Sequence, residues 1–266
     1  MTSTRFCRVA YTIDAIDQDV EALRTLFGME SKFVGFVPPA IRVAFGVHGI
    51  EPIKVVDAFP AFDPLPLPFL EIALAVDDAE KRKGLLEAAG YSVAIVSYLP
   101  LPDKNEYLFA DIHGLPVMVC TDGDNELQSG YPSLEVTPPP RLAGATVMAS
   151  NFDAAVADFA RFFDMKFTPC NPTGLGKRVV GGAHRLRLVD QPSQALAAHA
   201  VHGFLSMDII VQDTSRVHAA LERAGIALVA QLPLRSGRTG GFYGNGLKSL
   251  PFTVYDARDE AELLGQ

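Results

Sequence analysis

Two stretches of this chain repeat one another without a gap, and this internal repeat constrains the possible fold more than any other feature. Residues 5–29 read RFCRVAYTIDAIDQDVEALRTLFGM, and residues 141–165 read RLAGATVMASNFDAAVADFARFFDM. Each copy begins with a short apolar run rich in β-forming residues and continues past an Asp into an amphipathic helical pattern. Each copy therefore corresponds to one structural unit, which the fold must contain at least twice.

A second pair of matching stretches follows the first. Residues 69–90 read FLEIALAVDDAEKRKGLLEAAG, and residues 204–225 read FLSMDIIVQDTSRVHAALERAG. In both copies an Asp stands where a helix N-cap is expected, and a Gly follows the last helical residue, where helices commonly end. The sequence therefore predicts four strand–helix units arranged as two similar halves.

The stretch between the two halves, residues 123–140, is turn-rich and ends in three prolines, which is typical of a linker. We expect a first domain at residues 1–122, a second domain at residues 141–256 and a charged tail at residues 257–266. In each unit, further strands follow the strand–helix pair. The four predicted units span residues 1–57, 69–122, 141–190 and 204–256.

Composition argues against several classes of protein. With 266 residues and 48% hydrophobic content, the chain can build two domains of ordinary size. No apolar run reaches the roughly 18 residues that cross a bilayer, and the N-terminus shows no signal-peptide pattern. A net charge of −8 argues against a nucleic-acid partner. Three cysteines without CxxC spacing fit a reducing compartment, so we expect a cytoplasmic protein.

The repeated units resemble those of the vicinal oxygen chelate superfamily, which includes glyoxalase I, extradiol ring-cleavage dioxygenases and bleomycin-resistance proteins. The resemblance rests on the repeated order of apolar strand, Asp, helix and aromatic residue, which ends here in FGM and FDM. In addition, FLEIALAVDD and FLSMDIIVQD resemble the family's second-unit start, HHIAFEVDD. The resemblance implies an α+β fold of four βαβββ units, in which each half curls eight strands into an incomplete barrel around a cavity.

Metal enzymes of this family place His, Gln and Glu ligands on several strands of a unit pair. Carried over by position, those ligands fall on Arg8, Lys54, Glu71 and Met118 in the first half and on Gly144, Arg187, Ser206 and Thr253 in the second. Only Glu71 is a suitable ligand, whereas a divalent cation needs about three or more protein donors. We therefore expect no metal and no other cofactor.

Strand alternation predicts which side chains share the first cavity. Arg8 lies on the first strand, Lys54 on a strand expected at residues 53–56, and Glu71 on the FLEIALAV strand. A buried Glu needs cationic partners, because an unpaired buried charge is costly. One interpretation is a structural ion cluster in place of a metal. The other is a carboxylate-binding site with Arg8 as its bidentate partner.

In the second half, Asp208 stands out on an otherwise apolar strand. Burial would raise the pKa of its carboxyl, so that it could act as a general acid or base, with Arg187 as the substrate anchor. The alternative is a structural Asp208–Arg187 pair. Tyr243, in a glycine-rich stretch read as a loop, is the second catalytic candidate and could close over a ligand or simply pack at the barrel mouth. The further substrate-binding candidates are Thr146, Ser206, Thr253 and Tyr255.

Three functions remain open at this point. The first is a metal-independent enzyme that acts on a small, partly apolar oxygenated or carboxylated metabolite, aromatic ones included, by isomerase, lyase or hydrolytic acid–base chemistry. The second is a binding protein that sequesters an apolar small molecule, as bleomycin-resistance members do. The third is a metal-dependent dioxygenase or glyoxalase with other ligands. The expected partner is a small molecule, and the protein is a monomer or a homodimer.

Overall fold

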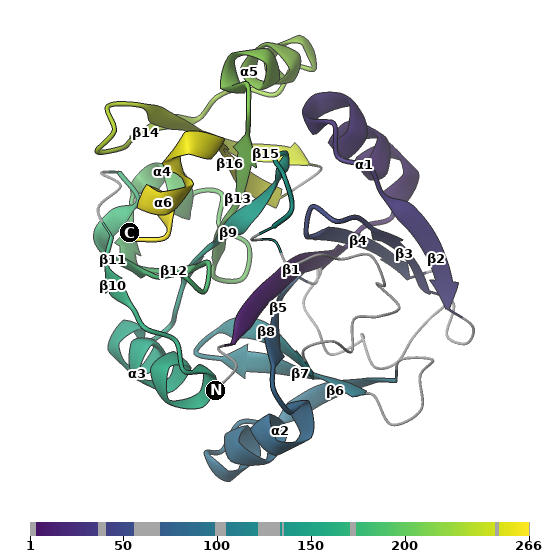
Figure 1. The fold of residues 1–266 in the computed structure, drawn as a ribbon, viewed down its shortest axis with the longest axis vertical. Helices are drawn as coiled ribbons and strands as arrows, with labels where there is room; N and C mark the ends of the chain where they lie inside the picture. The colour runs from purple at the N-terminus through teal and green to yellow at the C-terminus, as the bar shows by residue number, and fades with distance from the viewer. Residues whose placement is uncertain are drawn as a thin grey trace.

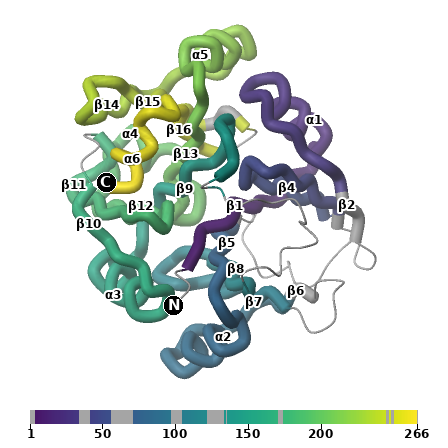
Figure 2. The backbone as a smooth tube through the Cα atoms, in the orientation of Figure 1, coloured from purple at the N-terminus to yellow at the C-terminus, as the bar shows by residue number. Residues whose placement is uncertain are grey.

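The computed structural model describes residues 4–36, 41–55, 70–98, 105–121, 134, 136–170, 174–247 and 250–265. They form two halves that lie side by side, each built on one eight-stranded sheet (Figures 1 and 2). The elements of the first half are β1 (Arg5–Thr12), α1 (Ile16–Ala22), the π-helical turn η1 (Leu23–Phe27), β2 (Lys32–Phe36), β3 (Ile41–Phe45), β4 (Ile50–Val55), β5 (Leu70–Val76), α2 (Ala79–Ala88), β6 (Val93–Tyr98), β7 (Asn105–Ile112) and β8 (Leu115–Thr121).

The second half repeats this order and also shows two further helices. Its elements are β9 (Arg141–Met148), α3 (Phe152–Phe163), β10 (Thr168–Pro169), β11 (Gly176–Gly181), β12 (Leu186–Pro192), α4 (Gln194–Ala197), β13 (Phe204–Val211), α5 (Thr214–Arg223), β14 (Ala230–Pro233), β15 (Thr239–Leu247), β16 (Leu250–Asp256), the 3-10 turn η3 (Ala257–Asp259) and α6 (Glu260–Leu263). Among the described residues, α4 and α6 have no counterpart in the first half.

The two sheets share one topology. The first sheet has the order β2-β3-β4-β1-β5-β8-β7-β6, and the second has the order β10-β11-β12-β9-β13-β16-β15-β14. These orders coincide when each element of the first half is replaced by its repeat partner. The predicted α+β fold of four βαβββ units in two tandem half-barrels is confirmed. The domain limits stay predictions, and most of the expected linker at 123–140 lies outside the described residues.

Matching sequence signals produce matching local structure. The side chain of Asp78 accepts a hydrogen bond from Lys81 N at 2.9 Å, and Asp213 accepts one from Arg216 N at the same distance. Each caps the first turn of its helix, because the first backbone N–H groups of a helix have no partner within it. The glycines that end both helices adopt positive φ, +97° at Gly90 and +75° at Gly225.

Two buried histidines hold equivalent strand starts in the two halves. The Nδ1 atom of His48 accepts a hydrogen bond from Ile50 N at 3.2 Å, and His184 Nδ1 accepts one from Leu186 N at 3.4 Å. This contact starts β4 at Ile50, earlier than the strand expected at 53–56. The difference matters because it brings Glu51 into the sheet.

The glycine-rich stretch read as a loop is strand β15, so that part of the prediction was wrong. A Cβ at Gly240 would lie 2.2 Å from the ring of Tyr255, and one at Gly244 would lie 2.3 Å from His199. Glycine is required at these positions because neighbouring side chains lie directly against the strand backbone.

The main hydrophobic core lies between the halves and contains residues of both. Phe27 of the first half meets Phe252 of the second half edge to face, with ring centroids 5.5 Å apart. A polar contact also crosses the interface: His113 Nε2 lies 2.9 Å from Asp158 Oδ2 of the second half and 2.9 Å from Tyr91 Oη of its own half. The described residues include no helix with the length and apolar character that a membrane crossing requires.

Candidate functional site

The interior of the first half contains one arginine surrounded by three glutamates, which we call the Arg8 cluster (Arg8, Glu51, Glu71 and Glu106). Arg8 Nε lies 3.0 Å from Glu51 Oε2, and Arg8 Nη2 lies 3.7 Å from Glu71 Oε1. Arg8 Nη2 also donates to both carboxylate oxygens of Glu106, at 3.1 and 3.2 Å. Each of the four residues is at most 6% exposed. The cluster therefore joins strands β1, β4, β5 and β7 in a site almost closed to bulk water.

Strand register explains why these groups meet. Ala10 of β1 stands opposite Glu51 of β4 on one side and Glu71 of β5 on the other. Arg8 and Ala10 are two residues apart, so their side chains leave the same face of β1. Because Ala10 carries only a methyl group, the guanidinium of Arg8 has room to reach the carboxyls on both neighbouring strands.

The cluster has more carboxyls than cations, and this imbalance alters its protonation. Burial raises the pKa of Glu71 to about 8 and that of Glu51 to about 7, although Arg8 acts in the opposite direction on both. Burial also opposes the charge on Arg8, but Glu106, Glu51 and Glu71 together hold the pKa of the guanidinium above its ordinary value. A buried carboxyl with a pKa near neutrality can donate or accept a proton at physiological pH.

Two nitrogens of Arg8, Nε and Nη1, make no hydrogen bond with the described residues, but Nε lies beside Glu51 Oε2 as an ion pair. Arg8 Nη1 is buried and makes no hydrogen bond with the described residues. A buried donor without a partner is unfavourable, and such a group commonly indicates a position that a ligand or water completes. Apolar side chains surround the cluster on the same face: Ala73, Ile95, Leu108 and Met118 on one side and Ala10, Val43 and Ile53 on the other. The site thus combines a polar centre with an apolar wall.

The donors present do not fit the metal ion that the fold family implies. The guanidinium of Arg8 already lies among the three carboxylates, and its positive charge would repel a cation placed there. Within the described ranges, no group of three or more His, Cys, Asp or Glu side chains is arranged to hold a metal ion. We therefore derive no chemistry through a metal in this half.

The structure brings Arg8 and Glu71 together, as expected, but it directs Lys54 elsewhere. Lys54 is half-buried on β4, three residues from Glu51, and strand alternation places the two side chains on opposite faces. Sequence reasoning missed Glu51 and Glu106. A charged residue two positions ahead of the strand expected at 53–56 was the available signal for Glu51, and the alternation of Glu106 with buried Leu108 was the signal for Glu106.

In the second half, Asp208 and Arg187 form an ion pair with 2.7 Å between Asp208 Oδ2 and Arg187 Nη2. Thr146 Oγ1 donates to Asp208 Oδ2 at 2.8 Å, and Arg187 Nη2 donates to Tyr255 Oη at 3.2 Å. The structure thus gathers the side chains that alternation assigned to this interior. Every member of the group is at most 3% exposed; the group consists of Thr146, Arg187, Ser206, Asp208, Thr253 and Tyr255.

The second group contains one carboxylate, Asp208, and one guanidinium, Arg187, so its charges balance. Side chains of α4 and α6 cover the group. Burial raises the pKa of Asp208, while Arg187 and Thr146 oppose the shift. Leu196 of α4 and Leu263 of α6 share a core cluster with Tyr255. Figure 1 shows both helices inside the ring of second-half strands. Helix α6 is fastened there by Glu260, whose carboxylate lies 2.7 Å from Arg141 Nη2 and 2.6 Å from Arg185 Nη1.

Gly144 stands at a family ligand position, where so small a residue suggests open space, but the structure fills that space. A Cβ at Gly144 would lie 2.0 Å from the carbonyl oxygen of Arg185. The glycine therefore allows the backbone at Arg185 to approach β9 closely. The space that a side chain would take is filled by main chain, which leaves this interior more tightly packed than the sequence suggested.

Tyr243 lies on the other face of the second sheet, away from Asp208. Its ring stacks on Phe252 with centroids 5.2 Å apart, and its hydroxyl is hydrogen-bonded to Nδ1 of His218 on α5. The neighbouring residue, Phe242, belongs to the interior that holds Tyr255. Because successive strand residues face opposite sides, the two catalytic candidates cannot act on one ligand from these positions.

Solved structures with the same fold cover nearly the whole chain. The Mn(II)-bound glyoxalase from Novosphingobium aromaticivorans matches with a TM-score of 0.64 at 16% identity, over 96% of this chain and 82% of that chain. The 2,3-dioxygenase LapB from Pseudomonas sp. KL28 matches with a TM-score of 0.60 at 12% identity, over 97% of this chain and 93% of that chain. The 2,2′,3-trihydroxybiphenyl 1,2-dioxygenase from Sphingomonas wittichii strain RW1 matches with a TM-score of 0.62 at 11% identity, over 96% of this chain and 91% of that chain. No protein-family model and no curated protein matches the sequence.

These similarities confirm the fold that the sequence resemblance predicted. The chain has the two tandem half-barrels of the vicinal oxygen chelate fold, which the matched glyoxalase and dioxygenase structures share. At 16% identity or less, the similarity concerns the fold alone. The residues that act in this chain must be argued from its own geometry.

Proposed function

We propose that this chain is a metal-independent enzyme that acts on a small, partly apolar oxygenated or carboxylated metabolite through acid–base chemistry at the Arg8 cluster. The observation that carries the proposal is the excess of three buried carboxyls over one guanidinium, with the pKa of Glu51 raised to about 7 and that of Glu71 to about 8. Such a pair supports both a proton donor and a proton acceptor at neutral pH.

Each residue of the cluster has a role in this proposal. Arg8 Nη1, the donor without a partner, binds a carbonyl or carboxylate oxygen of the substrate. Glu51 accepts a proton from the substrate, and Glu71 donates one, which suits an isomerisation, an elimination or a hydrolytic cleavage. Glu106 holds the guanidinium in place through its two hydrogen bonds. The apolar wall accommodates the remainder of a small, partly apolar molecule.

The Asp208–Arg187 pair is the second candidate for the same chemistry. Asp208 Oδ1 and Arg187 Nη1 also lack hydrogen-bond partners among the described residues. Two observations favour a structural role instead. One carboxylate balances one guanidinium, and α4 and α6 cover the pair with apolar side chains. A sequestering role without turnover is the alternative function for the first half, because binding at Arg8 Nη1 requires no proton transfer.

The test uses a panel of small aliphatic and aromatic carboxylic acids and ketones with two readouts. A rise in melting temperature reports binding, and incorporation of solvent deuterium into the compound reports proton transfer. We expect Glu71→Gln and Glu51→Gln to abolish deuterium incorporation while the melting shift persists. Glu87→Gln, on the exposed surface of α2, is the matched control and should behave as the wild type.

Three results would contradict this proposal. Binding with no proton transfer to any panel member would favour the sequestering protein. Loss of proton transfer in Asp208→Asn but not in Glu71→Gln would move the site to the second half. Near-stoichiometric manganese, iron, nickel or zinc in the purified protein, together with loss of activity on its removal, would establish a metal-dependent reaction.

A further inference from the structure

The outer face of the second sheet carries a groove of about 980 Å³ beneath helix α5. It lies on the side of the sheet that holds Tyr243, away from Asp208 and from the Arg8 cluster. Figure 1 shows α5 at the edge of the molecule above β14, β15 and β16. The residues that matter for its chemistry are Ser215, His218, Ile226, Leu228, Gly241 and Tyr243.

The first half shows what the equivalent space contains there. Tyr107 of β7 is 4% exposed, and its hydroxyl is hydrogen-bonded to Glu80 of α2. Lys83 of α2 places its Nζ 5.1 Å from the centroid of the Tyr107 ring. The first half thus seats one phenol ring between its helix and its sheet, with a partner for the hydroxyl group.

Strand register identifies the second-half counterpart of Tyr107 as Gly241. Tyr107 stands opposite Val119 of β8, and Gly241 stands opposite Val254 of β16. The matched stretches 69–90 and 204–225 likewise place Ser215 at the position of Glu80 and His218 at the position of Lys83. In the second half the phenol ring is therefore missing, while groups able to contact a ring and a hydroxyl remain.

The floor of the groove is aromatic. A Cβ at Gly241 would lie 2.5 Å from Cε1 of His218, so the imidazole rests against the backbone of β15. His218 stacks on Tyr243 with ring centroids 5.9 Å apart. Leu228, which is 46% exposed, and half-buried Ile226 supply the apolar side. A flat aromatic molecule would gain stacking and apolar contact on this surface.

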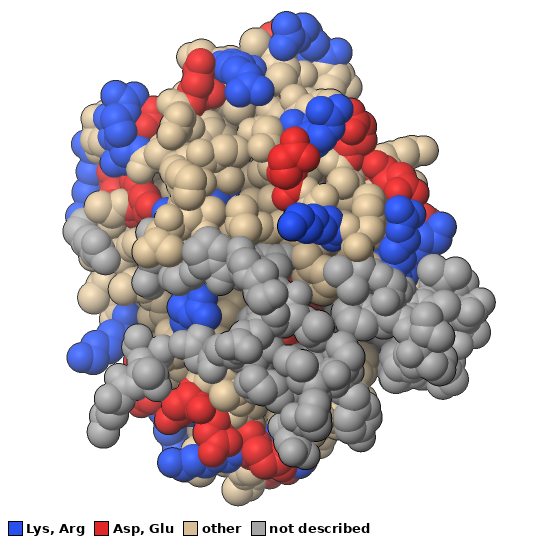
Figure 3. Space-filling model, turned by 45° about the vertical axis from the view of Figure 1, so that its right-hand side comes forward, with Lys and Arg blue, Asp and Glu red and all other residues tan. Residues whose placement is uncertain are grey.

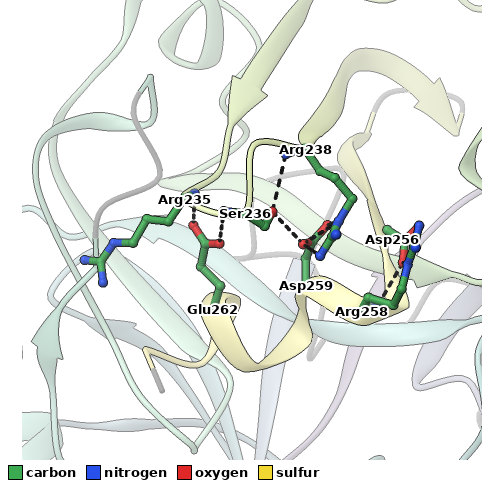
Figure 4. A network of polar contacts seen from close by, with 7 residues as sticks. All are labelled: Arg235, Ser236, Arg238, Asp256, Arg258, Asp259 and Glu262. Atoms are coloured by element: carbon green, nitrogen blue, oxygen red, sulfur yellow. Dashed lines mark hydrogen bonds and ion pairs between the residues drawn. The ribbon is translucent and has the colours of Figure 1, made fainter.

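Both arginines of the groove have carboxylate partners, and Glu222 adds a further carboxylate to its lining. Arg258 Nη2 lies 2.7 Å from Asp256 Oδ2, and Arg238 forms hydrogen bonds with Asp259 of the C-terminal segment (Figure 4). Basic and acidic side chains are also interspersed over the face shown in Figure 3. Because its arginines already have partners and Glu222 adds a negative charge, the groove offers little to an anion.

We propose that this groove binds a neutral phenol, an aromatic ring with one hydroxyl group, against the His218 imidazole, which lies where the tyrosine side chain of the first half begins. The ring stacks along His218, and Ser215 takes the hydroxyl group as Glu80 does for Tyr107. The site is separate from the Arg8 cluster and does not rest on the proposed acid–base function.

The test uses 4-methylphenol, which is the side chain of tyrosine itself, and follows its binding by NMR. We expect saturable shifts of the His218 and Tyr243 ring signals and of the Leu228 methyl signals, with a millimolar Kd, because the ligand is small. The anion 4-methylbenzoate, of similar size and shape, should bind more weakly.

Two variants locate the binding site. Gly241→Tyr supplies the missing ring from the chain and should weaken 4-methylphenol binding about tenfold or more. The backbone of Gly241 lies outside the positive-φ region, and the nearest atoms to a new Cβ belong to the side chains of His218 and Leu228, which can move. Leu228→Asp, at an exposed position, tests the groove again without filling it and should also weaken binding.

Gly84→Tyr is the matched control, because the same ring is added where a Cβ would have no atom within 4 Å. It should leave binding unchanged. The proposal fails if no saturable shift occurs at His218 and Tyr243, or if both Gly241→Tyr and Leu228→Asp are folded by circular dichroism and bind as the wild type. It also fails if 4-methylbenzoate binds as well as the phenol.

Discussion

Glu51 of β4 and Arg187 of β12 occupy the same position in the two halves and carry opposite charges. Glu51 pairs with Ala10, and Arg187 pairs with Thr146, which matches Ala10 in the repeat. This exchange of charge separates the two interiors. The first half gathers three carboxyls around one guanidinium, whereas the second half pairs one carboxylate with one guanidinium.

Removing the carboxylate of Asp208 should destabilise the protein strongly. In Asp208→Ala, Arg187 stays buried without its counter-charge, and we expect a loss of about 3–5 kcal/mol in the free energy of unfolding. The joint replacement Arg187→Met with Asp208→Leu should recover most of that loss. Urea denaturation measures both. Asp190→Ala breaks the more exposed Asp190–Arg178 pair and should change stability far less, because solvent screens that pair. An equal loss for Asp208→Ala and Asp190→Ala would contradict a buried, stabilising pair.

Glu71 should make the protein less stable at alkaline pH. Its pKa is raised from 4.5 to about 8 by burial, so the folded state holds a proton that the unfolded state releases. The contribution to stability is complete below the unfolded pKa and is lost as pH rises toward about 8. Denaturation curves recorded across that range should show a decline of up to roughly 1.4 kcal/mol per pH unit, which Glu71→Gln removes. If the free energy of unfolding of Glu71→Gln changed with pH in parallel with that of the wild type, the Glu71 carboxyl would not retain its proton in the folded state.

The two buried histidines should act at the acidic end of the pH range. Burial lowers the pKa of His48 and of His184 from 6.5 to about 4. Protonation therefore favours the unfolded state, and the stability present above about pH 6.5 declines as pH falls toward about 4. NMR titration should find both imidazoles neutral at pH values where an exposed histidine is charged. Protonation of either ring near its ordinary pKa would contradict the tight burial of these strand starts.

Glycines of the chain should respond oppositely to the same substitution. Gly240→Ala would bring a Cβ to 2.2 Å from the Tyr255 ring, which is itself fully buried, so we expect a loss of about 1–3 kcal/mol. Gly84→Ala on α2 meets no atom within 4 Å and should stabilise the helix by about 0.5–1 kcal/mol. Thermal unfolding of the two variants measures both. A neutral effect of Gly240→Ala would mean that β15 and Tyr255 separate easily.

The sequence by itself determined the repeat, the order of elements and the faces of single strands. The matching Asp and Gly positions produced the caps and ends of α2 and α5, because capping depends only on residues near one another in the chain. Alternation correctly grouped Asp208 with Ser206 and Arg187 with Val189, since the side-chain period of a strand is two.

Only the tertiary structure decided which strands bring their charges together and what covers them. Glu51 joined the Arg8 cluster because His48 begins β4 at Ile50, which no periodicity within the strand reveals. Tyr243 separated from Asp208 because β15 is a strand that places them on opposite faces. The second interior was closed by α4 and α6, whose docking depends on contacts between residues far apart in sequence. Local pattern fixes what a segment forms, whereas pairing register and packing between segments fix which side chains meet.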